Sequence, residues 1–345
     1  MKNKNTPINI LGIETSCDET AAAVVADGRI IKSSVVASQA DLHSKYGGVV
    51  PEIASRAHIE NLYQVISQAV EDAKVTKDDI HAVAVANQPG LTISLIVGVT
   101  AAKTLAMMWE KPLIAINHIH AHLQSAMLEE KQIDLPAVAL VVSGGHTSLY
   151  DCRSPLCLKL LGSTIDDAAG EAFDKVATML NLPYPGGPSI EKTAESGNPK
   201  AVNFPRSMLG PDSLDFSFSG IKTAVLYHCQ GQDMKGRNKV GFMTRQEIAD
   251  IAASFQAAVI DVLVKKTERA AEKIKAETIL LGGGVAANNV LRSELQNLAK
   301  NTGRKLFVAP KRYCTDNAVM IASLAYHKFN AGLFEDLTLD VKAGI

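Results

Sequence analysis

Three histidines stand close together at His118, His120 and His122, directly after the apolar run from Pro112 to Ile116. If a helix follows this run, His118 and His122 lie one turn apart on the same face, with Cβ atoms about 6 Å apart. Two imidazoles at that spacing can share a metal ion, although the pair is also compatible with an ordinary surface or core helix. His120 projects roughly 200° away from His118 on an ideal helix, so we expect it to be a neighbour of the ligands at most.

A third ligand is predicted at Asp316, which lies between an expected strand and an expected helix in the second half of the chain. Its position there corresponds to that of the histidine pair in the first half. Two imidazoles and one carboxylate leave coordination positions open, as in a catalytic metal site, and they suit iron, zinc or manganese. The H-E-x-x-H pattern of zinc proteases is not matched, because no Glu follows the first histidine.

The glycine-rich segment from Gly282 to Asn289 follows an expected strand and opens an expected helix. Backbone N–H groups and the helix dipole favour a phosphate or a nucleotide at such a position, although tight strand-to-helix packing also explains the glycines. Neither G-x-x-x-x-G-K-[ST] nor G-x-G-x-x-G is present. Two polar turns, Glu14 to Thr20 and Ser143 to Thr147, each end an apolar run, and we expect them to complete a three-sided cradle with the glycines. That arrangement is typical of the actin, Hsp70 and sugar-kinase fold.

Asp18 and Glu19 lie at the tip of the first turn. Carboxylates are unsuited to gripping a phosphate, but they can orient a cation, a water or a substrate amine, or accept a proton. They are alternatively no more than turn residues.

Strands alternate with helices in both halves, which predicts an α/β fold with two repeated layers, each on a mostly parallel sheet. We place the domain boundary between residues 133 and 134, giving domains 1–133 and 134–345. Residues 183–245 concentrate proline and glycine and are expected to form an irregular insertion near a site. The basic stretch from Lys235 to Lys239 within it is either a solvated loop or an RNA phosphate contact.

The composition describes an ordinary folded protein of 345 residues with a formal net charge of −1. A net charge this close to zero gives the protein no overall electrostatic attraction to nucleic acid or to a membrane surface. Five scattered cysteines without a C-x-x-C pattern fit reduced thiols. The first residues resemble neither a signal peptide nor a membrane span, so we expect a cytoplasmic protein.

Eight motifs in order resemble the TsaD/Gcp family, and the similarity runs from about Ile8 to Gly332. They are Gly12 to Thr20, Tyr46 to His58, His118 to His122, Val142 to Thr147, Gly170 to Lys175, Tyr184 to Pro188, Phe216 to Thr223, and Gly283 to Asn288. The resemblance implies an actin-like two-domain fold. It also implies an acyltransferase that moves the L-threonylcarbamoyl group from threonylcarbamoyl-AMP to N6 of adenosine 37 in tRNAs that read ANN codons.

The resemblance also implies the site residues. The metal ligands would be His118, His122 and Asp316, with iron(II) the usual ion and zinc an alternative. The substrate-binding residues would be Val141, Val142, Ser143, Gly144, Gly145, Asp174, Gly187, Glu191 and Asn288.

Its implied partners are tRNA, the shorter actin-like protein TsaB and the small ATPase TsaE. Alternatives are an actin-fold kinase or ATPase, a metal-dependent glycoprotein endopeptidase, or a nucleotide-gated scaffold. The first alternative leaves the histidine pair idle, and the second lacks its protease motif.

Overall fold

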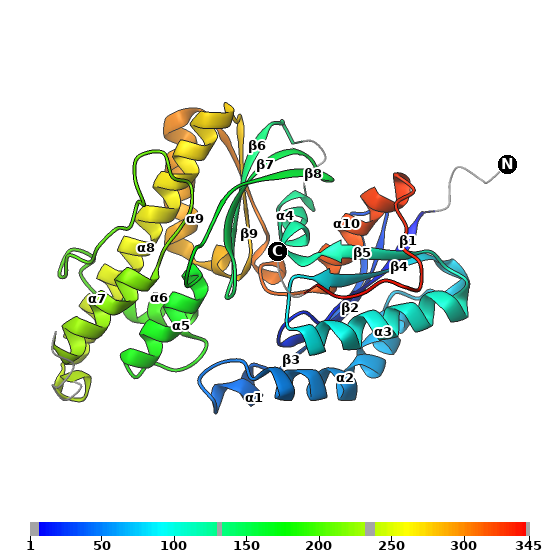
Figure 1. Cartoon of the computed structure of the whole chain (residues 1–345), viewed down its shortest axis with the longest axis horizontal. Coiled ribbons are helices and arrows are strands. Elements are labelled where there is room, and N and C mark those ends of the chain that lie inside the picture. Colours follow the sequence, from blue (N-terminus) through cyan, green and yellow to red (C-terminus); the bar gives the residue numbers. More distant parts are fainter. Residues whose placement is uncertain (1–6, 130–132, 232–238, 343–345) are drawn as a thin grey trace. The chain divides into compact units, whose positions relative to one another are not determined.

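The computed structural model describes residues 7–129, 133–231 and 239–342. The chain forms two compact units, Met1–Lys131 together with Ala309–Ile345, and Gln132–Val308 (Figure 1). The segment from Ala309 onward therefore belongs with the first unit, whereas the sequence placed it in the second domain. The reason is helix α10 (Ala318–Asn330), which packs directly on strand β1 (Asn9–Glu14) of the first sheet.

The first unit contains a five-stranded sheet in the order β3-β2-β1-β4-β5. The other strands are β2 (Glu19–Ala26), β3 (Ile30–Ser38), β4 (Ile80–Gln88) and β5 (Leu113–Asn117). β1, β2 and β3 pair antiparallel, while β1–β4 and β4–β5 pair parallel. The prediction of a mostly parallel sheet was wrong, because short turns join the first three strands and a short turn allows only antiparallel pairing.

Helices cover both faces of this sheet. Helices α2 (Pro51–Asp72) and α3 (Thr92–Trp109) share a core with Leu11 and Ile13 of β1. Helices α10 and α4 (His118–Met127) share the opposite core with Ile10. Successive residues of a strand point to opposite faces, which is why Ile10, Leu11 and Ile13 are all apolar. A short helix, α1 (Ala40–Ser44), and 3-10 turns at η1 (Lys77–Asp79) and η4 (Lys311–Tyr313) complete the unit.

Helix α3 is long and apolar enough to cross a membrane by length and composition alone. Its inner face, including Leu95, Val99 and Ala102, is buried in the core of the first unit. A core helix packed on a sheet can have the same length and apolar composition, so these two properties are weak evidence that α3 crosses a membrane.

The second unit repeats the same sheet, in the order β8-β7-β6-β9-β10. Its strands are β6 (Ala137–Val142), β7 (Thr147–Ser154), β8 (Cys157–Ser163), β9 (Thr278–Gly282) and β10 (Lys305–Val308). β6–β7 and β7–β8 are antiparallel, and β6–β9 and β9–β10 are parallel, as in the first unit. The predicted architectural repeat is confirmed strand by strand.

The helices of the second unit include two inside the stretch that we predicted to be irregular. They are α5 (Ala169–Met179), α6 (Gly186–Ala194), α7 (Ser219–Gln230), α8 (Arg245–Ile274) and α9 (Asn289–Thr302), with 3-10 turns η2 (Lys239–Phe242) and η3 (Gly284–Ala287). The prediction for 183–245 was wrong for α6 and α7, because carboxylates from outside the stretch hold both helix starts. Asp174 accepts from the Gly186 N–H at 2.7 Å, and Asp166 accepts from the Phe218 N–H at 2.8 Å. The basic residues from Lys235 to Asn238 lie outside the described part of the chain.

Candidate functional site

Two asparagine-capped helices position the three predicted metal ligands. Asn117 ends β5 and its side chain accepts from the Ile119 and His120 N–H groups, so α4 starts at His118. Asn317 caps α10 in the same way through the Met320 N–H, which places Asp316 just before that helix. The capping asparagines fix where each helix begins, and therefore where the ligands lie.

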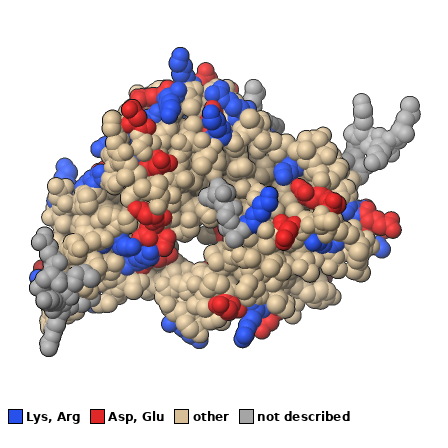
Figure 2. All heavy atoms as spheres, in the orientation of Figure 1, with Lys and Arg blue, Asp and Glu red and all other residues tan. Residues whose placement is uncertain are grey.

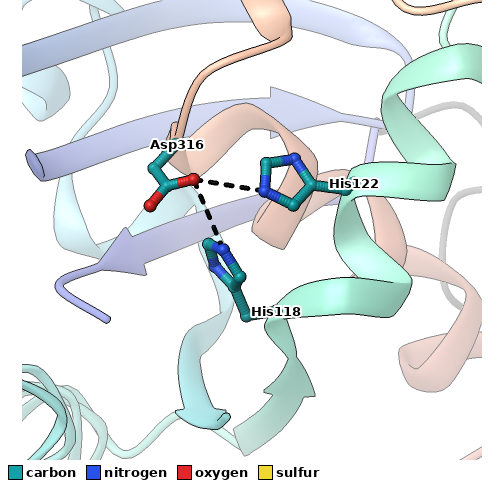
Figure 3. Close-up of side chains that lie close together, drawn as sticks. All are labelled: His118, His122 and Asp316. Carbon is teal, nitrogen blue, oxygen red and sulfur yellow. Dashed lines mark ion pairs between the residues drawn. The ribbon is translucent and has the colours of Figure 1, made fainter. Parts of the chain in front are cut away.

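His118, His122 and Asp316 converge at one point of the first unit (Figure 3). Oδ1 of Asp316 lies 3.3 Å from Nε2 of His118 and 3.1 Å from Nε2 of His122. The two rings meet edge to face, with centroids 4.6 Å apart. One ligand atom from each residue lies within 4.8 Å of the others, so the group can hold a metal ion. His120 is not part of it, as predicted.

Burial and charge set the protonation of these groups. Burial alone lowers the pKa of His118, but the neighbouring Asp316 and Glu14 raise it well above its ordinary value. Burial also opposes ionisation of Asp316, yet the two histidines hold its pKa well below the usual range. Burial lowers the pKa of His122, which keeps that ring in the neutral form that binds metals. The cluster therefore combines an ionised carboxylate at Asp316 with a neutral imidazole at His122, which suits a divalent cation.

Glu14 is a functional residue that the sequence reasoning did not single out. Its carboxylate is fully buried at the end of β1, and Oε2 accepts from Nδ1 of His118 at 2.8 Å. Oε1 accepts from the Ser16 N–H at 2.5 Å, and the Ser16 hydroxyl lies 3.0 Å from the same histidine nitrogen. A carboxylate on the far nitrogen of a ligating histidine fixes the orientation of its ring. The signal was present, because Glu14 is a charged residue ending an apolar strand.

Asp18 and Glu19, the predicted acidic pair, lie near the metal ligands within the first unit. Burial and the charges of Asp18 and Asp316 raise the pKa of Glu19 to about 9, and Glu19 also shares a hydrogen bond with Asp18. Glu19 accepts a further bond from the Ser38 hydroxyl at 3.0 Å. The raised pKa favours the protonated form of the Glu19 carboxyl group.

The second unit brings the predicted substrate residues into one connected region around the end of β6. Val141 and Val142 are buried within that strand, while Gly144 and Gly145 are exposed in the turn that follows. The Gly144 carbonyl accepts from the Glu171 N–H at 3.0 Å, which ties the turn to α5. The exposed glycine backbone leaves space for a ligand, because a Cβ at Gly144 or Gly145 would meet nothing within 4 Å.

The glycine-rich start of α9 adjoins the same strand end. Gly283 has a φ of +95°, and a Cβ there would lie 2.3 Å from the Val142 carbonyl oxygen, so glycine is required. Asn288 caps α9 by accepting from the Leu291 N–H, and it donates to Gln256 of α8 at 2.8 Å. Gln256 is a further residue that the sequence analysis missed.

The remaining predicted residues brace this region. Asp174 holds the start of α6, where Gly187 has open space around its Cα. Glu191 of α6 accepts from the backbone and side-chain N–H groups of Asn289 at 2.7 and 2.8 Å. Glu191 thus links α6 to the start of α9.

The family model for tRNA N6-adenosine threonylcarbamoyltransferase, TsaD, matches residues 30–323 of the chain. The chain belongs to the TsaD family. It is 50% identical over 349 residues to a Rhodopirellula baltica protein named tRNA N6-adenosine threonylcarbamoyltransferase, which covers 97% of this chain and 96% of that protein. A Symbiobacterium thermophilum protein of the same name is 51% identical over 337 residues, with 97% and 96% covered. This TsaD-family chain therefore matches such relatives over nearly their whole length.

Solved structures confirm the predicted actin-like, sugar-kinase type of fold for this TsaD-family chain. Full-length HypF in its phosphate- and nucleotide-bound form aligns with a TM-score of 0.61 at 14% identity, covering 95% of this chain and 47% of that one. A ROK hexokinase from Thermus thermophilus aligns with a TM-score of 0.51 at 16% identity, covering 94% and 100%. At these identities the similarity concerns the fold alone.

Proposed function

We propose that this protein transfers the L-threonylcarbamoyl group from threonylcarbamoyl-AMP to N6 of adenosine 37 in tRNA, with release of AMP. The observation that carries the proposal is the cluster of the buried His118 and His122 with the partly buried Asp316, braced by Glu14, in a chain of the TsaD family. A kinase or ATPase of the same fold has no use for this cluster. An endopeptidase function lacks the H-E-x-x-H motif.

The residues fit a divalent metal ion, which we propose to be iron(II), with zinc as the alternative. His118, His122 and Asp316 would hold it, and Glu14 would keep Nε2 of His118 directed at it. When bound, such an ion supplies Lewis-acid stabilisation of negative charge on a carbonyl or phosphoryl oxygen. Three protein ligands leave room for that oxygen, as in other catalytic sites.

The region at the end of β6 is proposed to bind the adenylate. The exposed backbone of Gly144 and Gly145 offers N–H groups without side-chain obstruction. The start of α9 at Asn288 lies beside the same strand end. Val141, Val142, Ser143, Asp174, Gly187 and Glu191 complete or support this region.

Asp18 is proposed to accept the proton lost by the attacking adenine amine. The pKa of Glu19 is raised to about 9, which favours its protonated form, so we assign the acceptor role to its neighbour Asp18. The adenine amine is a weak nucleophile, so positioning contributes most of the rate. Asp18→Ala and Glu19→Ala variants that both retained the full transfer rate with normal metal content would disprove this role.

TsaB and TsaE are the proposed protein partners, and the cytoplasm is the proposed location. Figure 2 shows Lys and Arg interspersed with Asp and Glu among the described residues of the viewed face. Helices α2 and α3, which pack together, carry exposed apolar side chains at Ile59, Tyr63, Ile93 and Ile96. An apolar surface of this kind suits a partner protein.

One assay separates the candidate functions. Purified protein is incubated with threonylcarbamoyl-AMP and tRNA, with and without TsaB and TsaE, and threonylcarbamoyl-adenosine and AMP are quantified. We expect transfer that is lost in His118→Ala and Asp316→Asn. ATP turnover with a sugar, or cleavage of a glycoprotein, without any transfer would support a rival function instead.

A further inference from the structure

Three successive carbonyls in the turn between β1 and β2 are each bonded to a donor from outside the turn. The Leu91 N–H donates to Ser16 at 2.8 Å, and the Gln39 N–H donates to Asp18 at 3.1 Å. Between them, Nε2 of His58 donates to the Cys17 carbonyl at 2.9 Å. His58, on α2, is therefore the one side chain among these three donors, and it holds the peptide next to Asp18.

The other ring nitrogen of His58 shows which tautomer is present. Because Nε2 donates, Nδ1 must accept, and it lies 2.8 Å from the Thr20 hydroxyl and 3.4 Å from Nε2 of Gln39. Burial lowers the pKa of His58, which agrees with a neutral ring. Both nitrogens of this fully buried imidazole are satisfied in one arrangement only.

The chain of bonds continues to a second buried histidine. Nε2 of His43 donates to the Gln39 side-chain oxygen at 3.2 Å, and the Val50 N–H donates to Nδ1 of His43 at 3.3 Å. Each group in this chain donates to the next one: Val50 to His43, His43 to Gln39, Gln39 to His58, and His58 to Cys17. His43, Gln39 and His58 are 0%, 1% and 0% exposed. A buried polar network whose members are all satisfied specifies a single geometry.

We propose that His58 is a positioning residue for the turn that carries Asp18 and Glu19, with Gln39 and His43 holding His58 in its working tautomer. The inference rests on the proposed function for its catalytic consequence. Glu14, Asn117 and Asn317 hold the predicted metal ligands through bonds in which His58 takes no part, so we expect metal binding to persist when His58 is replaced.

Substitutions at His58 separate the role of Nε2, which donates to the Cys17 carbonyl, from the role of Nδ1, which accepts from its neighbours. His58→Gln places an amide near the position of Nε2 and retains a donor for Cys17, whereas His58→Asn places its amide near Nδ1 and loses that donor. We expect kcat for transfer to fall about 10- to 100-fold in His58→Asn and His58→Ala, to be largely restored in His58→Gln, and KM and metal content to stay unchanged. His81→Gln is the matched control, because His81 accepts from the Asn9 N–H at the end of β1 opposite the turn.

Two measurements need no activity at all, so failure of the proposed function and failure of this inference are distinguishable. Nitrogen-15 NMR should show His43 and His58 as neutral Nε2–H tautomers at pH 7. Hydrogen exchange at residues 15–20 should accelerate in His58→Asn but not in His58→Gln. An Nδ1–H tautomer at His58, equal exchange in the two variants, or equal kcat in folded His58→Ala and wild type would overturn the proposal.

Discussion

At the scale of single residues, the contact between Glu14 and His118 orients the proposed metal ligands. The carboxylate binds Nδ1 of His118, which leaves Nε2 directed at Asp316 and His122. His122 has no equivalent bond, since its Nδ1 has no hydrogen-bond partner among the described residues. The orientation of the pair therefore depends on His118, and through it on Glu14.

Glu14→Gln should weaken metal binding by about 10- to 100-fold, because the amide cannot fix the ring as the carboxylate does. The measurement is a competition titration with a chelator on purified protein at constant pH. Glu52→Gln, an exposed residue in the first turn of α2, is the control and should bind metal like the wild type. Equal affinity in Glu14→Gln and wild type would show that Glu14 does not orient the ligand.

His58 should make the stability of the protein fall in mild acid. Its folded-state pKa lies below the ordinary 6.5, because the effect of burial and of His43 exceeds that of the Cys17 bond, Glu14 and Asp18. The unfolded chain then binds a proton first as the pH falls below about 6.5, which favours unfolding. Above that pH the ring is neutral in both the folded and the unfolded state, so it does not make the free energy of unfolding depend on pH.

The comparison that isolates this effect is wild type against His58→Gln in urea unfolding at several pH values. The wild type should lose stability relative to the variant from about pH 6.5 downward, and the difference should be constant above about pH 7. A difference that does not change with pH would mean that His58 titrates normally in the folded protein.

Among the helices and strands, the closeness of β1 and α10 decides where Asp316 lies. A Cβ at Gly12 would lie 2.5 Å from the Ala318 carbonyl oxygen and 2.8 Å from the Ala322 nitrogen, so the helix rests directly on the strand backbone. Asp316 precedes this helix by one turn residue, the cap Asn317. Any shift of α10 therefore moves the carboxylate relative to the histidines on α4.

Gly12→Ala should destabilise the protein by about 1–3 kcal/mol, as expected for overpacking against backbone atoms, and should also weaken metal binding. Thermal unfolding and the chelator titration provide the two measurements. Gly220→Ala is the control, since Gly220 lies in α7 and a Cβ added there would meet nothing within 4 Å. If Gly12→Ala lost stability but kept full metal affinity, the link between α10 and the site would be refuted.

Across the whole molecule, the chain leaves the first unit near residue 131 and returns to it at Ala309. The returning segment supplies Asp316 and also the buried side chains of Val319, Met320 and Ile321. Each fully buried aliphatic side chain contributes about 1.5–3 kcal/mol. The sum approaches the total stability of a domain, about 5–15 kcal/mol.

A chain that ends at Val308 should therefore lose the first unit while retaining the second, which is continuous in sequence. Limited proteolysis should digest residues 1–131 and leave a resistant fragment near 132–308. Adding residues 309–345 as a separate chain should restore some protection to the first unit. Equal protease resistance of both units in the shortened chain would contradict this dependence.

Local patterns in the sequence were enough to predict the repeated layers of strands and helices and the group of residues that could hold a metal ion. The His118 and His122 spacing is a local property of one helix, and the alternation of strands and helices predicted the repeated layers that the two sheets display.

Features that depend on residues far apart in the chain emerge only from the tertiary fold. Antiparallel pairing of β1 to β3 follows from which strands meet, and α6 and α7 form where distant Asp174 and Asp166 hold their first N–H groups. The bond from Glu14 to His118 spans 104 positions, and the chain of bonds through His58 joins four segments. Hydropathy patterns record which face of an element is buried, but not which polar group lies opposite, so these contacts became visible only in the folded chain.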